Sequence, residues 1–169
     1  NGSTIGFDAS NMSATALFAV GTHTLGNNDT EWVYVQAQTT IKDLSWVSIN
    51  STFSAAMASA ADVLIASNAF GVANVAISAS SYGWIAIRGA NLSALFTGTG
   101  SLAPTSGQMQ LASSAGPTGY VMLGTVGTAS CTLAGVGLSA TASSSATGLG
   151  TNAANVMLVN LYWPLVATP

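Results

Sequence analysis

Residues 81–89 read Ser-Tyr-Gly-Trp-Ile-Ala-Ile-Arg-Gly and have the two-residue period of a β-strand. This period puts Tyr82, Trp84 and Arg88 on one face of the strand and two isoleucines on the other. Both faces carry side chains suited to burial, whereas a soluble antiparallel sheet usually buries one face and leaves the other in water. We therefore expect the face of Trp84 and Arg88 to be covered by protein, either from the same chain or from a neighbour.

A second strand, predicted over residues 31–40, divides its side chains in the same way, with valines on one face and Trp32 and Tyr34 on the other. The preceding residues 15–25 are predicted to form its hairpin partner, because Gly-Asn-Asn-Asp at 26–29 is typical of a tight turn. Trp, Tyr and Arg dominate the energetics of protein interfaces. The candidate interface residues are therefore Trp32, Tyr34, Tyr82, Trp84 and Arg88, together with Trp163 near the C-terminus.

Short β-type segments separated by Gly, Ser and Asn continue along the chain, at residues 44–50, 63–67, 71–78, 91–96, 108–113, 119–126, 130–139 and 155–163. Residues 51–62 are the one segment predicted as a helix, because Ser51 or Thr52 can cap it and its Ala and Met residues favour it. Residues 97–107 and 140–154 are rich in Gly, Ser and Thr and are predicted to be loops.

The pattern predicts an all-β fold, an antiparallel β-sandwich or barrel of short strands with long Gly/Ser/Thr-rich loops and at most one short helix. No internal repeat and no domain boundary is apparent in the sequence. We expect residues 1–169 to form a single β domain, with residues 1–13 as a candidate extended N-terminal arm.

The chain is almost uncharged: two basic and five acidic residues among 169 make up 4% of the composition, against about 25% in typical globular proteins. A surface with few charges has little electrostatic repulsion to keep molecules apart. We therefore expect a chain that packs against other protein, including copies of itself. A secreted Ser/Thr-rich domain that stays soluble through its hydroxyls is the alternative. Two scattered cations neutralise few phosphates, so a nucleic-acid partner is not expected.

Residues suited to catalysis are scarce, since no charged side chain follows Arg88. His23, Asp29 and Glu31 surround the predicted turn and could ligate a metal ion, but solvated turn residues explain them better. Cys131 is the only cysteine and is expected to be a buried, inert thiol. We therefore expect no enzymatic activity, no metal and no cofactor.

Targeting to a membrane is not expected either. The most apolar stretch, residues 155–169, is interrupted by Asn160 and Pro164 and is too short for a transmembrane helix. The N-terminal residues have neither the basic region nor the hydrophobic region of a signal peptide.

Residues 17–89 resemble a family of small structural proteins of tailed bacteriophages, the capsid decoration or cement proteins. The resemblance is carried by Leu-Phe-Ala-Val-Gly-Thr at 17–22, by residues 26–37 and by residues 70–89, with a closing strand at 155–164. It implies an all-β, non-enzymatic virion component on the outer capsid surface. Such a component would bridge subunits of the major capsid protein, and the resemblance also implies a homo-oligomer, most often a trimer.

Two other functions remain open from the sequence. A glycan- or receptor-binding fibre head or adhesin would use exposed Trp and Tyr rings to stack on sugars. A fragment of a membrane β-barrel would need repeated strands of about 9–11 residues with aromatic girdles.

Overall fold

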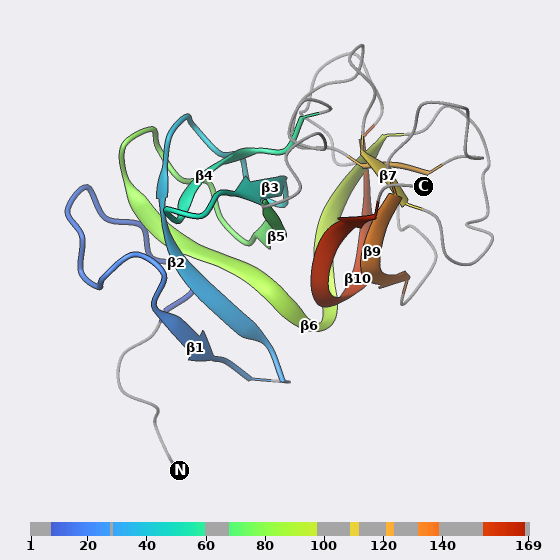
Figure 1. The fold of residues 1–169 in the computed structure, drawn as a ribbon, viewed down its shortest axis with the longest axis horizontal. Coiled ribbons are helices and arrows are strands. Elements are labelled where there is room, and N and C mark those ends of the chain that lie inside the picture. The colour runs from blue at the N-terminus through green and yellow to red at the C-terminus, as the bar shows by residue number, and fades with distance from the viewer. Residues whose placement is uncertain are drawn as a thin grey trace.

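The computed structural model describes residues 8–27, 29–59, 68–97, 109–111, 121–123, 132–138 and 154–167, which form strands and loops with no helix (Figure 1). The strands are β1 (His23–Leu25), β2 (Glu31–Ala37), β3 (Trp46–Ile49), β4 (Ser54–Met57), β5 (Ala69–Ala73), β6 (Tyr82–Thr97), β7 (Met109–Leu111), β8 (Val121–Leu123), β9 (Thr132–Leu138) and β10 (Ala154–Ala167). The predicted all-β class is confirmed, and of the two predicted architectures the structure has the barrel.

Five strands close this barrel in the order β2, β4, β3, β5, β6 and back to β2. Four of the five pairings are antiparallel, as predicted, and β2 and β4 pair in parallel. The barrel closes because alternate residues of every strand point inward and are apolar. The buried interior is made of Val33, Val35, Ala37, Ile41, Val47, Ile49, Ala55, Ala73, Ile77, Ile85 and Ile87.

A second ring of pairings follows in the order β6, β8, β7, β9, β10 and back to β6. Its connectivity repeats that of the barrel: the first strand pairs in parallel with the third, and the other four pairings are antiparallel. Each strand of the barrel corresponds to the strand numbered four higher in the second ring, so that β2 corresponds to β6 and β6 to β10. The repeat lies in the topology and is not apparent in the sequence.

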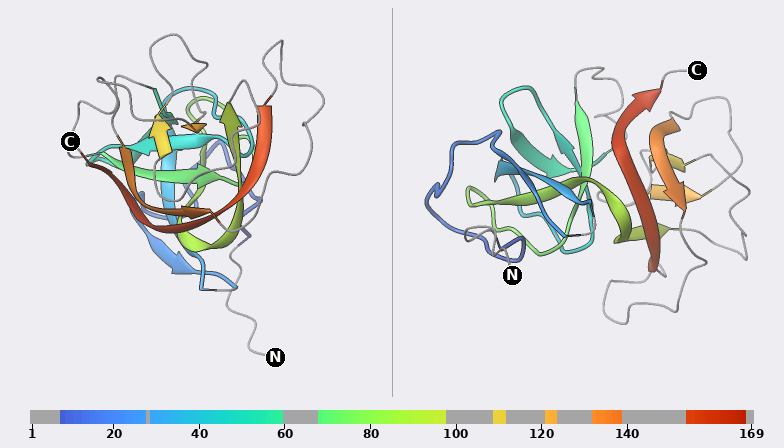
Figure 2. Two further views of the ribbon diagram at one scale, coloured as in Figure 1. Left: turned by 90° about the vertical axis from the view of Figure 1, so that its right-hand side faces the viewer. Right: turned by 90° about the horizontal axis from the view of Figure 1, so that it is seen from below.

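Strand β6 belongs to both rings, because its N-terminal half pairs with β2 and its C-terminal half with β10. Figure 2 shows β6 beside β10 after it leaves the barrel. The sequence predicted two strands here, residues 81–89 and 91–96, and the structure has one strand of 16 residues. Gly89 lies at the junction with a φ of 146°, a conformation that residues with a Cβ rarely adopt. The chain therefore changes direction at Gly89 while β6 continues as one strand.

The helix predicted over 51–62 is wrong where the structure describes it. Residues 54–57 are strand β4, hydrogen-bonded to β2 on one edge and to β3 on the other. Asn50 fixes the preceding turn, since its side-chain oxygen accepts hydrogen bonds from the backbone N–H groups of Thr52 and Ser54 at 2.9 and 3.0 Å. The pairing with two flanking strands thus outweighs the local helix propensity of Ala and Met.

The strand predicted over 15–25 is reduced to the three residues of β1, and the hairpin turn at 26–29 is confirmed by the antiparallel pairing of β1 with β2. Six other predicted strands match observed strands whose ends are shifted. In chain order, β3, β5, β7, β8, β9 and β10 correspond to the predicted ranges 44–50, 71–78, 108–113, 119–126, 130–139 and 155–163. Some predictions lie outside the described residues. They are the strand at 63–67, the buried thiol of Cys131, and nearly all of the loops at 97–107 and 140–154.

Candidate interaction site

Three aromatic rings gather on the outer side of the barrel where β2 and β6 pair. Trp32, Tyr34 and Trp84 are buried and pack with Ala86, and we call this surface the aromatic face. The ring centroids of Tyr34 and Trp84 lie 4.9 Å apart, and Tyr34 stacks on Tyr82 at 6.0 Å. These spacings are typical of packed aromatic pairs. The predicted second covered face of the strand is therefore present, and Trp84 is 3% exposed.

The chain's own N-terminal residues 8–22, which we call the strap, cover the aromatic face. Ser13 forms a bridge with Tyr82 through two backbone hydrogen bonds of 2.8 and 3.0 Å. The backbone N–H of Leu17 donates to the hydroxyl oxygen of Tyr34 at 3.1 Å. The ring of Phe18 lies 5.3 Å from those of Tyr34 and Trp84, centroid to centroid. The aromatic residues are thus covered within one chain.

Gly21 lies near the C-terminal end of the strap, two residues before β1. Its N–H donates to the carbonyl of Tyr34 at 2.8 Å, and its φ is 83°. A Cβ at this position would overlap the ring of Phe53, which packs against the barrel core. Glycine is therefore required here both for the backbone conformation and for the close approach of Phe53.

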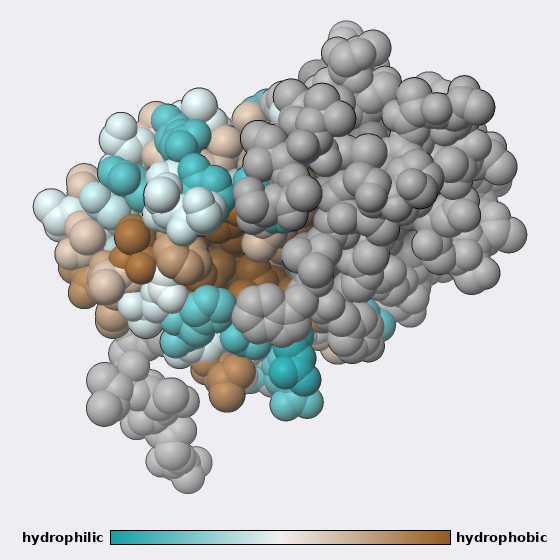
Figure 3. Space-filling model, in the orientation of Figure 1, coloured by the Kyte–Doolittle hydropathy of each residue, from teal (hydrophilic) through white to brown (hydrophobic). Residues whose placement is uncertain are grey.

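The outward side of the strap is polar at Asp8, Ser10, Asn11 and Thr15 and apolar from residue 16 to residue 20. Among the described residues, the exposed large hydrophobic side chains all lie in the strap or in β1, and they are Met12, Leu17, Phe18, Val20 and Leu25. Hydrophobic atoms are visible in Figure 3 at the left, over the segment drawn as the blue loop in Figure 1. No charged residue occurs between Asp8 and His23. Contiguous exposed apolar surface of this kind marks sites of contact with other proteins.

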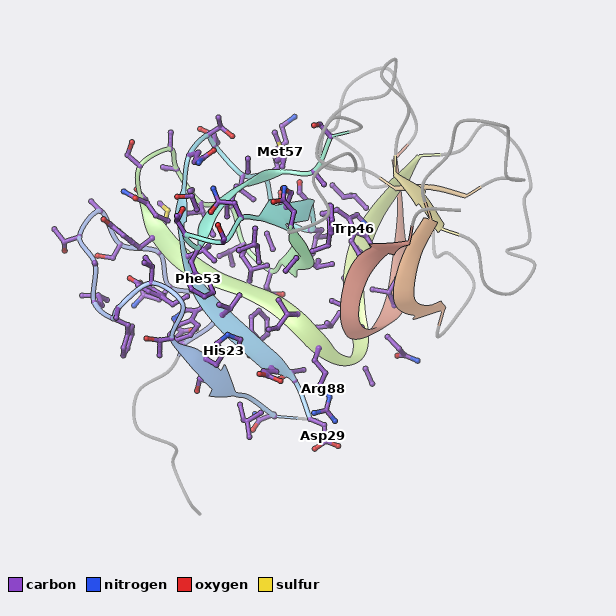
Figure 4. All side chains as sticks on the ribbon, in the orientation of Figure 1. His23, Asp29, Trp46, Phe53, Met57 and Arg88 are labelled. Carbon is purple, nitrogen blue, oxygen red and sulfur yellow. The ribbon has the colours of Figure 1, made fainter. Side chains whose placement is uncertain are left out.

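Ionisable side chains lie at the end of the β1–β2–β6 sheet, where Figure 4 labels His23, Asp29 and Arg88. Nδ1 of His23 lies 3.0 Å from a carboxylate oxygen of Glu31 on the neighbouring strand. Asp29 has a φ of 56° and occupies the turn, as expected for a turn-forming residue. The described residues contain no group of three or more His, Cys, Asp and Glu side chains placed to hold a metal ion.

At the N-terminal end of the strap, Asp8 accepts hydrogen bonds from the hydroxyl and the backbone N–H of Ser10. These two hydrogen bonds hold the pKa of Asp8 below its usual value of 3.8, because both favour the ionised carboxylate. The bond from the hydroxyl has the larger effect, and the bond from the N–H has the smaller one. This local turn places the one acidic side chain of the strap at its N-terminal end.

Arg88 does not share the buried environment of Trp84, because its side chain is exposed. The β2–β6 register shifts between Glu31 and Trp32, so that Arg88 lies opposite Glu31 and Ala86 lies opposite Trp32. A bulge of this kind changes the direction of the following side chain. The chain itself therefore covers Trp84 and leaves Arg88 uncovered. That a neighbouring chain covers Arg88 stays a prediction.

The remaining interface candidates are placed less centrally. Tyr82 is partly buried at the rim of the aromatic face. Trp163 lies in β10, and its side chain is outside the described residues. That these aromatic residues contact another chain stays a prediction.

The sequence analysis missed the apolar side chains of the strap as candidate contact residues. The available signal was the uncharged run Met-Ser-Ala-Thr-Ala-Leu-Phe-Ala-Val at 12–20, which lacks the regular alternation of a half-buried strand. Alternation distinguishes a paired strand from a segment that only lies across a sheet.

The described residues include no helix of the length and hydrophobicity needed to span a membrane. Comparison of the chain with protein-family models, with curated protein sequences and with solved structures finds no match in any of the three.

Proposed function

We propose that this protein is a structural component of a tailed-bacteriophage virion that binds the outer capsid surface and stabilises the shell by bridging subunits of the major capsid protein. The observation that carries the proposal is the apolar outer side of the strap at residues 16–20, held on a closed barrel. Of the segments that resemble the decoration proteins, residues 17–22 lie in the strap, residues 26–37 include β2, and residues 70–89 include most of β5 and the N-terminal half of β6. The resembling closing strand, residues 155–164, lies in β10. The first two segments and the N-terminal half of β6 build and support the surface of the strap.

The physical mechanism is burial of apolar surface between the strap and the shell. Each Å² of apolar surface removed from water contributes about 25 cal/mol before the costs of association. A protein that binds only the assembled shell stabilises it by mass action, and the effect repeats over the lattice. The strap is anchored at Ser13, Leu17 and Gly21, so little conformational freedom is lost when it binds.

A glycan- or receptor-binding head is the alternative function. It depends on exposed aromatic rings that stack on sugars, and the rings of Trp32, Trp46 and Trp84 are buried. This observation favours the structural role over the sugar-binding one.

The test is quantitative recovery of the protein with intact phage particles. We expect a fixed copy number relative to the major capsid protein, measured by mass spectrometry, and a lower disassembly temperature for particles stripped of the protein. Leu17→Ser, at a side chain that is 59% exposed, should weaken rebinding to stripped particles without changing the melting temperature of the free protein. The control is Thr40→Ser, at an exposed position outside the strap. Variable recovery, or equal rebinding of both variants, would contradict the proposal.

A further inference from the structure

Two exposed residues, 19 and 20, join the part of the strap that covers the aromatic face to the barrel, and we call them the hinge. Before the hinge, the ring of Phe18 packs on the aromatic face. After the hinge, the N–H of Gly21 donates to a carbonyl of β2 at 2.8 Å, so the chain from Gly21 onward belongs to the barrel. A turn closes the hinge, in which the N–H and the hydroxyl of Thr22 donate to the carbonyl of Ala19 at 3.1 and 2.7 Å. The course of the hinge therefore decides which barrel residues 8–18 cover.

Residues 8–18 contact parts of β2 and β6 that are distant from them in the sequence. Ser13 exchanges two backbone hydrogen bonds with Tyr82. The ring of Phe18 lies 5.3 Å from those of Tyr34 and Trp84, centroid to centroid. A second copy of the chain presents the same groups in the same arrangement. Residues 8–18 of one copy can therefore make all of these contacts on another copy, and only the hinge and its turn need to change.

We propose that residues 8–18 of one copy of this chain cover the aromatic face of a second copy, so that exchanged straps hold a homo-oligomer together. Exchange of an identical element between copies is a low-cost route to an oligomer, because no contact of the element is lost. A short hinge favours exchange over return of the element to its own chain. In the oligomer, the aromatic face of each copy is completed by Phe18 of a neighbour.

The exposed apolar side chains next to the hinge fit this arrangement. Val20 lies in the hinge and is 40% exposed, and Leu25, in the strand that follows, is 66% exposed. Figure 1 shows this region, drawn in blue, at the end of the molecule opposite β10. A hinge of two residues cannot span a gap, so copies that exchange straps lie in contact around it, and this contact removes apolar surface from water. Residues 9–22 carry no charge that would repel the second copy.

Disulfide trapping distinguishes a cover from the same chain from a cover from a second copy. The variant combines Ser13→Cys and Tyr82→Cys in a Cys131→Ala background. Ser13 and Tyr82 form a hydrogen-bonded antiparallel bridge, in which Cα atoms are about 5.5 Å apart, within the range of about 4.4–6.8 Å that a disulfide spans. After oxidation, a non-reducing denaturing gel should show most of the protein as covalent species of two or more chains.

The matched control keeps Tyr82→Cys and combines it with Gln36→Cys, which lies opposite Tyr82 on β2. Because Tyr82 directs its N–H and C=O groups to Ser13, its pair with Gln36 is of the non-hydrogen-bonded type, with Cα atoms about 4.5 Å apart. Both residues belong to the barrel, so their disulfide forms within one chain whether or not the straps exchange. The control should run as a single chain, and a single-chain band for the Ser13→Cys pair as well would overturn the proposal.

Light scattering keeps the proposal testable if a cysteine variant fails to fold. In the micromolar range, the unmodified chain should have a multiple of the 16.8 kDa of one chain. Inserting Gly-Gly-Ser-Gly between Ala19 and Val20 should give single chains, because a longer hinge lets residues 8–18 return to their own barrel. The same insertion between Thr39 and Thr40, at exposed positions outside the strap, should leave the oligomer intact.

A monomeric unmodified chain would overturn the proposal, as would an oligomer that survives insertion into the hinge. Neither assay contains capsid, so failure of strap exchange is separate from failure of the proposed function.

Discussion

The barrel buries two of its outer faces in different ways. The aromatic face on β2 and β6 is covered by the strap, which precedes β1 and β2 in the sequence. The outer face of β3 and β5, formed by Trp46, Ser48, Phe70 and Val72, is equally buried. There Nε1 of Trp46 donates to the carbonyl of Leu95 in the C-terminal half of β6 at 3.1 Å. Figure 4 shows Trp46 on the side of β3 that faces β10.

The comparison teaches that equal burial does not imply equal stability. The strap is held by a few hydrogen bonds and one ring, so it can open locally while the barrel stays closed. Exposure of Trp46 requires the second ring to separate from the barrel. Leu95 also donates its N–H to the carbonyl of Leu44 at 2.9 Å, and Leu165 of β10 pairs with Ala69 of β5. The predictions below test this difference, from the largest effect to the smallest.

Trp46→Ala should be the more destabilising of two matched tryptophan truncations. Trp46 is fully buried and hydrogen-bonded, so we expect its loss to lower the free energy of unfolding by about 4–5 kcal/mol. Trp84→Ala should cost less, about 3 kcal/mol, because the strap can relax into the space that the ring leaves. Urea denaturation followed by circular dichroism measures both. Equal costs, or a larger cost at Trp84, would remove the distinction between the two faces.

Gly21→Ala should loosen the strap selectively. The new Cβ is strained at a φ of 83° and overlaps the ring of Phe53, so we expect a loss of about 1–3 kcal/mol. Hydrogen exchange should accelerate at the amide of Leu17 and stay unchanged at that of Leu95, which serves as the internal control. Uniform acceleration at both amides would show that the strap does not open independently.

Tyr34→Phe removes the hydroxyl that accepts from the N–H of Leu17 and leaves the ring packing in place. We expect a loss of about 1 kcal/mol, as for a single neutral hydrogen bond. Faster exchange of the Leu17 amide, with the Ser13 amide less affected, would localise the effect. Unchanged exchange at Leu17 would mean that this hydrogen bond does not hold the strap.

Asp8 should produce the smallest effect. Since its pKa is lowered in the folded chain, its stabilising contribution is fully present above the usual value of 3.8 and is lost as the pH falls through the lowered pKa. An NMR titration of the Asp8 carboxyl carbon should give a pKa below 3.8. Ser10→Ala should raise it, and an unchanged pKa in this variant would contradict the assignment to Ser10.

The covering of the aromatic face was only partly predictable from the sequence. Alternation in residues 81–89 showed that both faces of this strand are suited to burial, and Trp84 is indeed covered. The identity of the cover was not predictable, because a strap and a neighbouring molecule satisfy the same alternation. The exposure of Arg88 depends on a bulge, which arises from the pairing of two strands and has no counterpart in the period of one strand.

The sequence by itself determined the β class, the hairpin turn at 26–29 and the low charge, because these depend on residue type and on periodicity within a few positions. The tertiary structure alone decided the closure of two rings, the sharing of β6 between them and the strand conformation of residues 54–57. Strand partners are selected by side chains that are distant in sequence, and their combined hydrogen bonding and packing exceed the local propensities of Ala and Met.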